Sequence, residues 1–349
     1  MTEKCIVDLR SDTVTKPTGN MLERMLAAKV GDDVYREDPS INELEQKVAE
    51  ILGKESALFV PSGTMANQIA IHLHCRPGDS VIAEQHSHCF EYEAGAAAAL
   101  SGVQFDFFSY QDDDLSDSIK HLIRSPQVYA ATSRLLVLEN THNRGGGRTL
   151  SPKDIQSATM TAKEYGLATH CDGARLWNAA VAQKVDIKQL SQPFDSIAVC
   201  LSKGLGCPAG SLLAASEEVI DRARKIRKRW GGGMRQAGFL AAAGTYALDH
   251  HRHRLADDHR RSQRLLDGIK NLKWNGLACE TIAPNPITNM IYFRWDAEQG
   301  DALSEALRKR GILVSHLGQG WLRAVTHLDV NDQDIEQTLH ALQSIVPSN

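Results

Sequence analysis

The stretch SIAVCLSKGLGCPAGSLLAAS, residues 196–216, indicates how this chain folds. Two apolar runs, 197–200 and 211–215, enclose a short polar segment that contains a single lysine, Lys203. Short runs that are apolar throughout are typical of strands covered on both faces, as in a parallel sheet flanked by helices. Lys203 would lie directly after the first of these strands. Because open parallel sheets bind their ligands beyond the carboxyl ends of the strands, we expect Lys203 to lie in a binding site.

The composition limits the class of protein. The chain has 349 residues, of which 42% are hydrophobic and 23% charged, which suits a sizeable core in roughly two domains. A net charge of -4 gives no reason to expect nucleic acid or a membrane surface as a partner. The first residues carry charges and no apolar run approaches the roughly 20 residues of a membrane helix, so we expect neither a signal peptide nor a membrane span. Seven scattered cysteines without a CxxC pair are typical of a reduced, cytoplasmic protein.

Short apolar runs alternate with polar turns and helix-compatible segments along most of the chain. The runs are 57–60, 80–83, 103–108, 135–139, 167–171, 197–200 and 211–215. This alternation predicts an α/β fold with a mostly parallel seven-stranded sheet wrapped by helices. After a basic helical stretch near residues 250–272, the runs MIYFRW, ILVSH and WLRAVTH follow, separated by helices. We therefore predict an N-terminal segment plus large domain over residues 1–250 and a smaller α+β domain over residues 251–349.

The turn PSGTMAN follows the first run and opens a helix. The hydroxyl groups of Ser62 and Thr64 and the backbone N–H of Gly63 would meet at the helix N-terminus, which suits an anion. The turn contains neither GxxxxGK[ST] nor GxGxxG, so a single phosphate group fits better than a nucleotide. The alternative is an ordinary helix N-cap, a position where Ser and Thr are favoured in any case.

Asp172 and Lys203 follow two successive strands, one strand–helix–strand unit apart, so both could face one crevice. A carboxylate at a strand end can pair with a protonated ring nitrogen, the partner that a pyridoxal phosphate ring requires. A partly desolvated lysine amine can form a Schiff base with a carbonyl cofactor. Singly, Asp172 could instead cap a helix and Lys203 could reach solvent. The phosphate turn, the carboxylate and the lysine together favour the cofactor.

With these residues the chain resembles the low-specificity L-threonine aldolase family of fold-type-I pyridoxal-phosphate enzymes. The resemblance extends nearly end to end through DLRSDTVTKPT, GDDVYREDPSINELE, FVPSGTMANQ, LENTHN, HCDGARLWNA, CLSKGLGCPAGSLL, GGGMRQAGFLAAAG, TNM and RAVTHLDV. It implies reversible cleavage of L-threonine, L-allo-threonine and related β-hydroxy-α-amino acids to glycine and an aldehyde, with pyridoxal 5'-phosphate as cofactor. It also implies a homotetramer, a dimer of dimers with shared active sites.

The resemblance assigns roles to individual residues. Lys203 is similar to the Schiff-base lysine, and Asp172 to the partner of the pyridine nitrogen. His88, in HSHCFEYEAG, aligns with a histidine that stacks on the cofactor ring and helps the base step, whereas His86 does not align. It leaves open whether His88 is the base itself or stacks while a water molecule takes the proton. The implied cofactor-binding set is Ser62, Gly63, Thr64, His88, Asp172, Arg175, Lys203 and Arg235, of which Arg235 would reach the phosphate of a neighbouring subunit.

The resemblance also implies a substrate site. Ser11, Arg175 and Arg323 match the groups that hold the substrate carboxylate, which accepts two parallel bonds from the fork of an arginine. Tyr35 matches a residue near the substrate pocket. Tyr129 stands where many relatives have a second histidine near the substrate hydroxyl. The choice between threo and allo substrates is therefore not fixed by the resemblance.

Two other functions remain open. A β-eliminating lyase or a racemase on the same fold would share Lys203 and Asp172 and would differ in its product. A non-catalytic binding protein is the second alternative, against which the intact lysine, aspartate and arginines argue. We predict no metal site, because the histidines of DHHRHR, residues 249–254, lack ligand spacing and suit a solvated helix. His72, His74 and Cys75 lie on an apolar helix, where we expect them to be packed.

Overall fold

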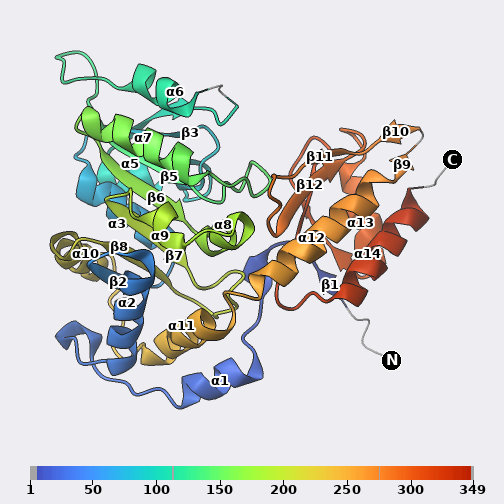
Figure 1. Ribbon diagram of the computed structural model, residues 1–349, viewed down its shortest axis with the longest axis horizontal. Coiled ribbons are helices and arrows are strands. Elements are labelled where there is room, and N and C mark those ends of the chain that lie inside the picture. Colours follow the sequence, from blue (N-terminus) through green and yellow to red (C-terminus); the bar gives the residue numbers. More distant parts are fainter. Residues whose placement is uncertain (1–5, 112–113, 275, 347–349) are drawn as a thin grey trace.

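The core of the larger part of the molecule is a seven-stranded sheet, seen in a computed structural model that describes residues 6–111, 114–274 and 276–346 (Figure 1). Its strand order is β2-β8-β7-β6-β5-β3-β4, and β8 runs against the other six strands. The strands are β2 (Ser56–Val60), β3 (Ser80–Glu84), β4 (Gln104–Phe108), β5 (Ser133–Glu139), β6 (Ala168–Gly173), β7 (Ser196–Cys200) and β8 (Ser211–Ala215). Each coincides with a predicted apolar run, so the predicted mostly parallel sheet is confirmed.

Alternate residues of the strands face opposite layers of helices. On β7, Ile197 and Val199 point into one core cluster and Ala198 into another. The first cluster contains residues of α2 (Pro39–Leu52), α6 (Leu115–Leu122), α7 (Pro152–Glu164), α8 (Leu176–Gln183), α9 (Ile187–Ser191) and α11 (Gly238–His250). The opposite layer contains α3 (Gly63–His74), α4 (His88–Glu91), α5 (Ala96–Ser101) and α10 (Glu217–Arg229). Helices therefore cover both faces of the sheet, as the continuous apolar runs predict.

The C-terminal part carries its own sheets and core. The order β11-β12-β15-β14 forms one sheet, from β11 (Glu280–Ile282), β12 (Met290–Arg294), β14 (Ser315–His316) and β15 (Leu322–Val325). A two-stranded sheet joins β9 (Lys273–Trp274) and β10 (Leu277–Ala278). The helices α12 (Leu255–Lys270), α13 (Gly300–Lys309) and α14 (Asp332–Ile345) pack on one another and on this part (Figure 1).

The start of the chain packs with this C-terminal part. β1 (Val7–Asp8) pairs in parallel with β13 (Ile312–Leu313), and Val7 and Leu9 are buried in the same core cluster as α12 and α14. The segment then continues through η1 (Asp12–Val14), α1 (Gly19–Leu26) and η2 (Asp33–Tyr35) to the large sheet. The domain boundary near residue 250 stays a prediction, and residues 7–9 are contiguous in space with the part beyond it.

Two sequence expectations concern other segments. α11 ends at His250, and the next residue, His251, is buried in a turn, where its Nδ1 lies 2.7 Å from the carbonyl oxygen of Leu205. The prediction of a solvated helix is therefore wrong for His251, because this turn packs on the loop that follows Lys203. In the ranges that the structure describes, no helix combines the length and the apolar character needed to cross a membrane.

Candidate active site

Asp172 lies at the carboxyl end of β6, at the level where the sequence predicts a site. It is 2% exposed. Its Oδ2 accepts a hydrogen bond from Nδ2 of Asn67 at 2.8 Å, and its Oδ1 accepts one from the backbone N–H of Ala174 at 3.1 Å. Buried carboxylates are normally paired with a cation. Among the residues that the structure describes, however, none forms an ion pair with Asp172.

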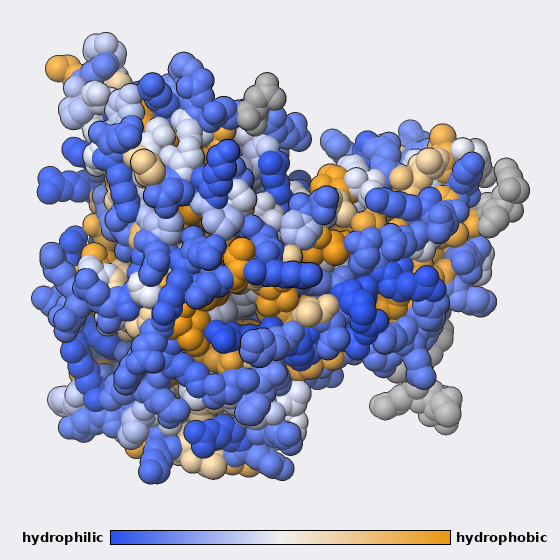
Figure 2. Space-filling view, in the orientation of Figure 1, coloured by the Kyte–Doolittle hydropathy of each residue, from blue (hydrophilic) through white to orange (hydrophobic). Residues whose placement is uncertain are grey.

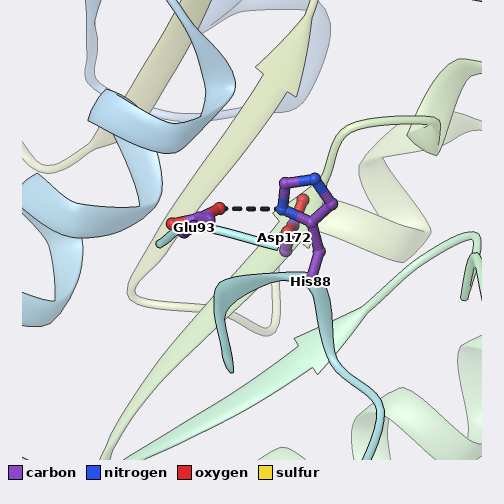
Figure 3. Close-up of side chains that lie close together, drawn as sticks. All are labelled: His88, Glu93 and Asp172. Atoms are coloured by element: carbon purple, nitrogen blue, oxygen red, sulfur yellow. Dashed lines mark hydrogen bonds and ion pairs between the residues drawn. The ribbon is translucent and has the colours of Figure 1, made fainter. Parts of the chain in front are cut away.

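His88 and Glu93 lie directly beside Asp172 and point toward each other (Figure 3). His88 begins α4, and its Nδ1 lies 2.9 Å from Oε1 of Glu93, whose side chain is fully buried while that of His88 is 31% exposed. Burial disfavours the charged imidazole, but the hydrogen bond to Glu93 and the charge of Asp172 outweigh it, so the pKa of His88 is raised. Among the described residues, none forms a hydrogen bond or an ion pair with the other ring nitrogen, Nε2.

Hydrogen bonds to the carboxylate of Glu139 connect the loop after β3, which carries His88, with the loop after β5. The carboxylate of Glu139 accepts hydrogen bonds from the backbone N–H of His88 at 2.8 Å and of Asn143 at 2.9 Å. Glu139 is buried at the end of β5, and burial raises its pKa. Glu139 therefore fixes the backbone position of His88 relative to the neighbouring strand.

Lys203 lies in the turn after β7, half-buried, with its backbone carbonyl accepting a hydrogen bond from the N–H of Gly206 at 2.8 Å. Its amine has neither a hydrogen bond nor an ion pair with any residue in the described ranges. Its charge acts on both His88 and the buried Asp12, so the amine lies near both groups. The role of Lys203 in the site stays a prediction.

The turn predicted to hold a phosphate begins α3. Ser62 caps the helix, since its Oγ accepts a hydrogen bond from the N–H of Met65 at 3.2 Å. The next N–H groups, of Gly63 and Thr64, are free of hydrogen bonds to the described part of the chain, as is usual in the first turn of a helix. A Cβ atom at Gly63 would lie 2.8 Å from Sγ of Cys200. Glycine therefore lets the helix N-terminus approach the end of β7, close to Lys203 in the chain.

Arg175 is paired with Asp12 across a long sequence distance. Its Nε and Nη2 donate to the two carboxylate oxygens of Asp12 at 2.8 and 2.7 Å, and both side chains are buried. Burial opposes ionisation of Asp12, yet Arg175, and beyond it Lys203 and Asn289, hold the pKa of Asp12 well below its usual range. Only Nη1 of the guanidinium group has no hydrogen bond to a described residue. The pair anchors the N-terminal segment to the end of β6.

Arg323 reaches the same segment from β15. Its Nη1 donates to Oδ1 of Asn143 at 2.9 Å and its Nη2 to the carbonyl oxygen of Arg10 at 2.9 Å, while its Nε is buried without a hydrogen-bond partner among the described residues. Ser11 follows Arg10 and directly precedes Asp12, and its Oγ accepts a hydrogen bond from the N–H of Thr13. Ser11 therefore lies between the contacts of Arg323 and Arg175.

Three residues predicted for the site, Tyr35, Tyr129 and Arg235, have exposed side chains. Tyr35 is 71% exposed and Tyr129 is 88% exposed. The side chain of Arg235 is 60% exposed and donates from Nη1 to Oδ2 of Asp32 at 2.9 Å, three residues before Tyr35. Within the described residues, no hydrogen bond or ion pair links these three side chains to Lys203, Asp172 or His88. Their assignment to the site stays a prediction.

An apolar cavity elsewhere does not include the predicted residues. It has a volume of about 730 Å³ and lies between α2, α8, α9 and the start of α12, where Trp177 and Ile187 line it. Figure 2 shows apolar residues gathered in this hollow, surrounded by hydrophilic ones. The chemistry-bearing cluster and this hollow are thus separate features of the fold.

Comparisons of the sequence with known proteins identify the family of this chain. The model of the beta-eliminating lyase family matches residues 8–296. A low specificity L-threonine aldolase of Escherichia coli O157:H7 is 41% identical over 334 residues, 95% of this chain and 97% of that protein. The low-specificity L-threonine aldolase 1 of Arabidopsis thaliana is 41% identical over 347 residues, 97% of this chain and 95% of that protein. The chain belongs to the beta-eliminating lyase family. It is a homologue of the low-specificity L-threonine aldolases, so the predicted family is confirmed.

The fold comparison agrees with the family. The structure of a threonine aldolase from Leishmania major superposes with a TM-score of 0.81 at 20% identity, over 97% of this chain and 99% of that one. The predicted fold-type-I architecture, with a large mostly parallel sheet and smaller C-terminal sheets, is confirmed. Beta-eliminating lyases and threonine aldolases of this family depend on pyridoxal phosphate.

Several residues around the site of this lyase are absent from the sequence-based prediction. They are Asp12, Asn67, Glu93, Glu139 and Asn143. Asn67 and Glu93 stand inside motifs that the resemblance uses, and their signal was available: Asn67 and Gln68 are amides in the middle of an apolar helix, and Glu93 follows His88 in the same loop. Asp12 also stands inside a quoted motif, DLRSDTVTKPT, but no local pattern reveals its pairing, because its partner Arg175 is distant in the chain.

Proposed function

We propose that this protein is a pyridoxal-phosphate-dependent aldolase that reversibly cleaves L-threonine, L-allo-threonine and related β-hydroxy-α-amino acids to glycine and an aldehyde. The nearly full-length similarity to named threonine aldolases supports the reaction. The observation that carries the proposal is the buried Asp172, which lacks a cationic partner among the described residues and lies beside His88. A protonated pyridine nitrogen is the partner that such a carboxylate requires.

The residues present fit pyridoxal 5'-phosphate. Free N–H groups at the start of α3 suit its phosphate, and the unpaired amine of Lys203 suits its carbonyl group. The predicted cofactor set, with Asp172 at the ring nitrogen and His88 at the ring face, would hold it. When bound, the cofactor supplies an electron sink for the pair of electrons left on Cα.

The substrate carboxylate would be held by Ser11, Arg175 and Arg323. Arg175 offers Nη1, since its other nitrogens bind Asp12, and Arg323 offers its buried Nε, which has no partner among the described residues. A charge-assisted grip from two sides fixes rotation about Cα and therefore sets which bond stands perpendicular to the ring. Orientation, more than affinity alone, is the contribution of these residues.

The proton of the β-hydroxyl group would be taken at Nε2 of His88. Glu93 holds Nδ1, so the neutral ring presents the lone pair of Nε2 to the substrate. The fraction of neutral imidazole falls as the pH drops through the pKa of His88, and because that pKa is raised, the fall begins at a higher pH than for a free imidazole. We therefore expect cleavage to weaken on the acid side of neutrality if His88 is the base.

We also propose a homotetramer, a dimer of dimers that shares its sites. The support is that Arg235 and the segment of Tyr35 lie together at one exposed edge, joined by Asp32 and by a hydrogen bond from the N–H of Asp33 to the carbonyl oxygen of Arg235. Light scattering should give the mass of four chains, and Arg235→Ala should weaken cofactor binding. An Arg235→Ala protein that binds the cofactor as tightly as wild type would remove this inference. The six cysteines in the described residues are all free, which supports a reducing compartment, the cytoplasm.

The test of the reaction is product analysis. The purified protein, loaded with pyridoxal 5'-phosphate, is given L-threonine, L-allo-threonine, their D-forms and phenylserine, and aldehyde and glycine are measured. We expect aldehyde and glycine in equal amounts from the L-substrates. Pyruvate or 2-oxobutyrate with ammonia would instead identify a β-eliminating lyase, and an inverted enantiomer a racemase. Absence of a visible absorbance band after loading would indicate a protein that does not use the cofactor.

A further inference from the structure

A continuous line of buried hydrogen bonds runs away from Asp172, between α3 and the strands β6 and β7. Nδ2 of Asn67 donates to Asp172 at 2.8 Å, and Oδ1 of Asn67 lies 3.1 Å from Nε2 of His170. Nδ1 of His170 lies 2.9 Å from Oγ of Ser196, which lies 3.0 Å from Nε2 of His74. Its five members are Asp172, Asn67, His170, Ser196 and His74, and we call them the polar chain.

Secondary structure brings the members of the polar chain together. Asn67 and His74 are two turns apart on α3, so they share one face and lie about 10 Å apart along the helix. His170 and Asp172 alternate with Cys171 on β6 and therefore point to the same side of the sheet. The register pairs His170 with Ser196 on β7. The polar chain thus lies at the contact between one helix and two strands.

Asn67 also connects the polar chain to His88. The same Nδ2 donates to Oε1 of Glu93 at 2.8 Å, and Gln68 donates to Oε2 of Glu93 at 2.6 Å. Glu93 in turn bonds to Nδ1 of His88. One amide therefore serves both the carboxylate predicted to face the pyridine nitrogen and the carboxylate that orients the histidine at the ring face.

The direction of every bond in the polar chain follows from what each group can donate. Ionised Asp172 and Glu93 only accept, so Asn67 must turn its NH₂ toward them and its oxygen toward His170. His170 must then carry its proton on Nε2, which leaves Nδ1 to accept from the hydroxyl of Ser196. Ser196 accepts in turn from Nε2 of His74. A reversed amide would set an oxygen against two carboxylates, and the proton on His170 prevents this.

The surroundings keep both histidines neutral. His170 is fully buried, and burial lowers its pKa to about 3 despite the charge of Asp172. Burial also lowers the pKa of His74, which faces Asp195 and Arg222 and lines a surface cavity of about 320 Å³. The polar chain therefore adds no net charge beneath Asp172, only oriented donors.

The same helix carries a second pair of similar groups. Nδ1 of His72 lies 3.2 Å from Oγ of Ser101, and its ring packs against Trp230 at 5.3 Å. In the described part of the chain, no hydrogen bond leads from this pair to Asp172. His72 and Ser101 therefore serve as matched controls for His74 and Ser196.

We propose that Asn67, His170 and Ser196 are positioning residues that fix the hydrogen-bond donors to Asp172 and Glu93. They thereby fix the position of Asp172, the predicted partner of the pyridine nitrogen, relative to His88, the histidine predicted at the ring face. The proposal rests on the proposed use of pyridoxal phosphate. It predicts a gradient: the effect of a substitution should fall with the number of hydrogen bonds between the changed residue and Asp172.

The first test uses the cofactor-free protein with 15N-labelled histidine. We expect the ring of His170 to be in the Nε2–H form and to stay so between pH 5 and pH 9, and we expect Ser196→Ala to weaken that preference while Ser101→Ala does not. An Nδ1–H ring, or one that titrates in this range, would overturn the assigned directions. This measurement is independent of any activity, so it separates failure of the polar chain from failure of the proposed function.

The second test compares cofactor-loaded variants by the dissociation constant of pyridoxal 5'-phosphate and by the pH midpoint of the visible absorbance change. His170→Phe removes the donor to Asn67 and should weaken binding about 10- to 100-fold and move the midpoint, as losses of supporting hydrogen bonds do around other bound groups. His170→Gln can still donate and should stay within about threefold of wild type. Ser196→Ala should give an intermediate loss, and His74→Leu the smallest, still larger than His72→Leu.

The outcomes divide clearly. A midpoint that moves in His170→Phe and is restored in His170→Gln supports positioning, because a merely structural loss would lower the melting temperature without moving the midpoint. The polar chain would be refuted if His74→Leu and His72→Leu change the dissociation constant equally and Ser196→Ala leaves the pH midpoint of the absorbance change unmoved. This outcome is decisive even if His170→Phe fails to fold. Wild-type protein that binds no cofactor would overturn the proposed function and this inference together.

Discussion

At the floor of the candidate site, Asp172 is 2% exposed and shares the amide of Asn67 with Glu93, whereas Tyr129, which is predicted for the rim, is 88% exposed. The floor, which comprises Lys203, Asp172, His88, Asn67 and Glu93, is built at one contact between the sheet and α3. The predicted rim, which comprises Ser11, Arg323, Tyr35 and Tyr129, comes from the N-terminal segment, β15 and exposed loops. The buried members Asp172, Asn67 and Glu93 are hydrogen-bonded to one another or to their neighbours, so a change at any of them would leave a polar group unpaired.

This difference indicates a division of labour. We expect the floor to determine cofactor binding and chemistry, and the rim to determine the substrate and the assembly. Substitutions at the floor should therefore change the absorbance of the loaded protein, and substitutions at the rim should leave it unchanged.

The largest effect should come from Lys203→Ala. Removal of the amine should abolish the adduct trapped by borohydride and lower turnover by about four orders of magnitude or more, as loss of a covalent residue does. Intact-mass spectrometry after borohydride and a turnover assay check this. Lys153→Ala, on the exposed face of α7, is the control and should behave as wild type. Normal turnover in Lys203→Ala would show that Lys203 is not the lysine that binds the cofactor covalently.

His88→Ala should slow cleavage by about 10²–10⁴-fold if Nε2 is the general base, with glycine binding largely intact. The measurement is single-turnover cleavage of L-threonine beside a glycine titration. His86→Ala is a matched control, because His86 bonds to Glu91 at the same sequence spacing as His88 to Glu93. A milder slowing would assign a stacking role to His88 and the proton to a water molecule, and cleavage at the wild-type rate would exclude both roles.

Arg323→Ala tests the rim. Loss of one side of the grip on the carboxylate should cost about 1.5–3 kcal/mol, or about 10- to 150-fold, in kcat/KM, with part of the loss in kcat because the grip orients Cα. The absorbance of the cofactor should not change. Arg294→Ala, on the neighbouring strand and paired with Glu280, is the control. Normal glycine binding by Arg323→Ala would contradict this role, and an altered cofactor spectrum would break the division between floor and rim.

Glu93→Gln tests the electrostatics of the floor. The hydrogen bond to Glu93 is the chief influence that raises the pKa of His88 against burial, so its pKa should fall in the variant. A lowered pKa keeps the imidazole neutral to lower pH, and the acid limb of the cleavage profile should move by about one pH unit in that direction. NMR titration of His88 in the cofactor-free protein gives the pKa directly. Glu91→Gln should leave the pKa of His88 unchanged. An unchanged pKa of His88 in Glu93→Gln would show that His88 and Glu93 are not coupled.

Tyr129→His should have the smallest effect. It introduces the histidine that the family resemblance implies for this exposed position, so we expect the ratio of kcat/KM for L-threonine and L-allo-threonine to change by less than about tenfold, or about 1.4 kcal/mol. The cofactor spectrum should not change. Val128→His places the same ring one residue away and is the control. An equal change in both variants would remove Tyr129 from the substrate site.

The floor could be predicted from the sequence only in part. Asp172 and Lys203 stand at strand ends, and strand ends follow from the apolar runs that precede them. Asn67 and His170 face each other only because β6 and α3 meet at one particular height and rotation, a relation that no local pattern contains. The same limit explains Asp12, which pairs with Arg175 because the start of the chain returns to the end of β6.

The exposed residues Tyr35, Tyr129 and Arg235 show the opposite limit. They come from family resemblance, and physical pattern alone gives no reason to select them. In one chain they are exposed. Their predicted roles therefore depend on contacts that a second chain or a ligand would make, and the sequence of one chain contains no pattern for such contacts.

The contacts of residues 7–12 have a consequence for biosynthesis. Residues 7–12 are synthesised long before their partners, since Val7 and Asp8 pair with Ile312 and Leu313, and the carbonyl oxygen of Arg10 accepts a hydrogen bond from Arg323. They must therefore wait for the C-terminal part before they can adopt their final structure. A nascent chain can complete the central sheet while the proposed carboxylate grip is still unformed, so we expect the ability to bind substrate to appear only after the central sheet is complete.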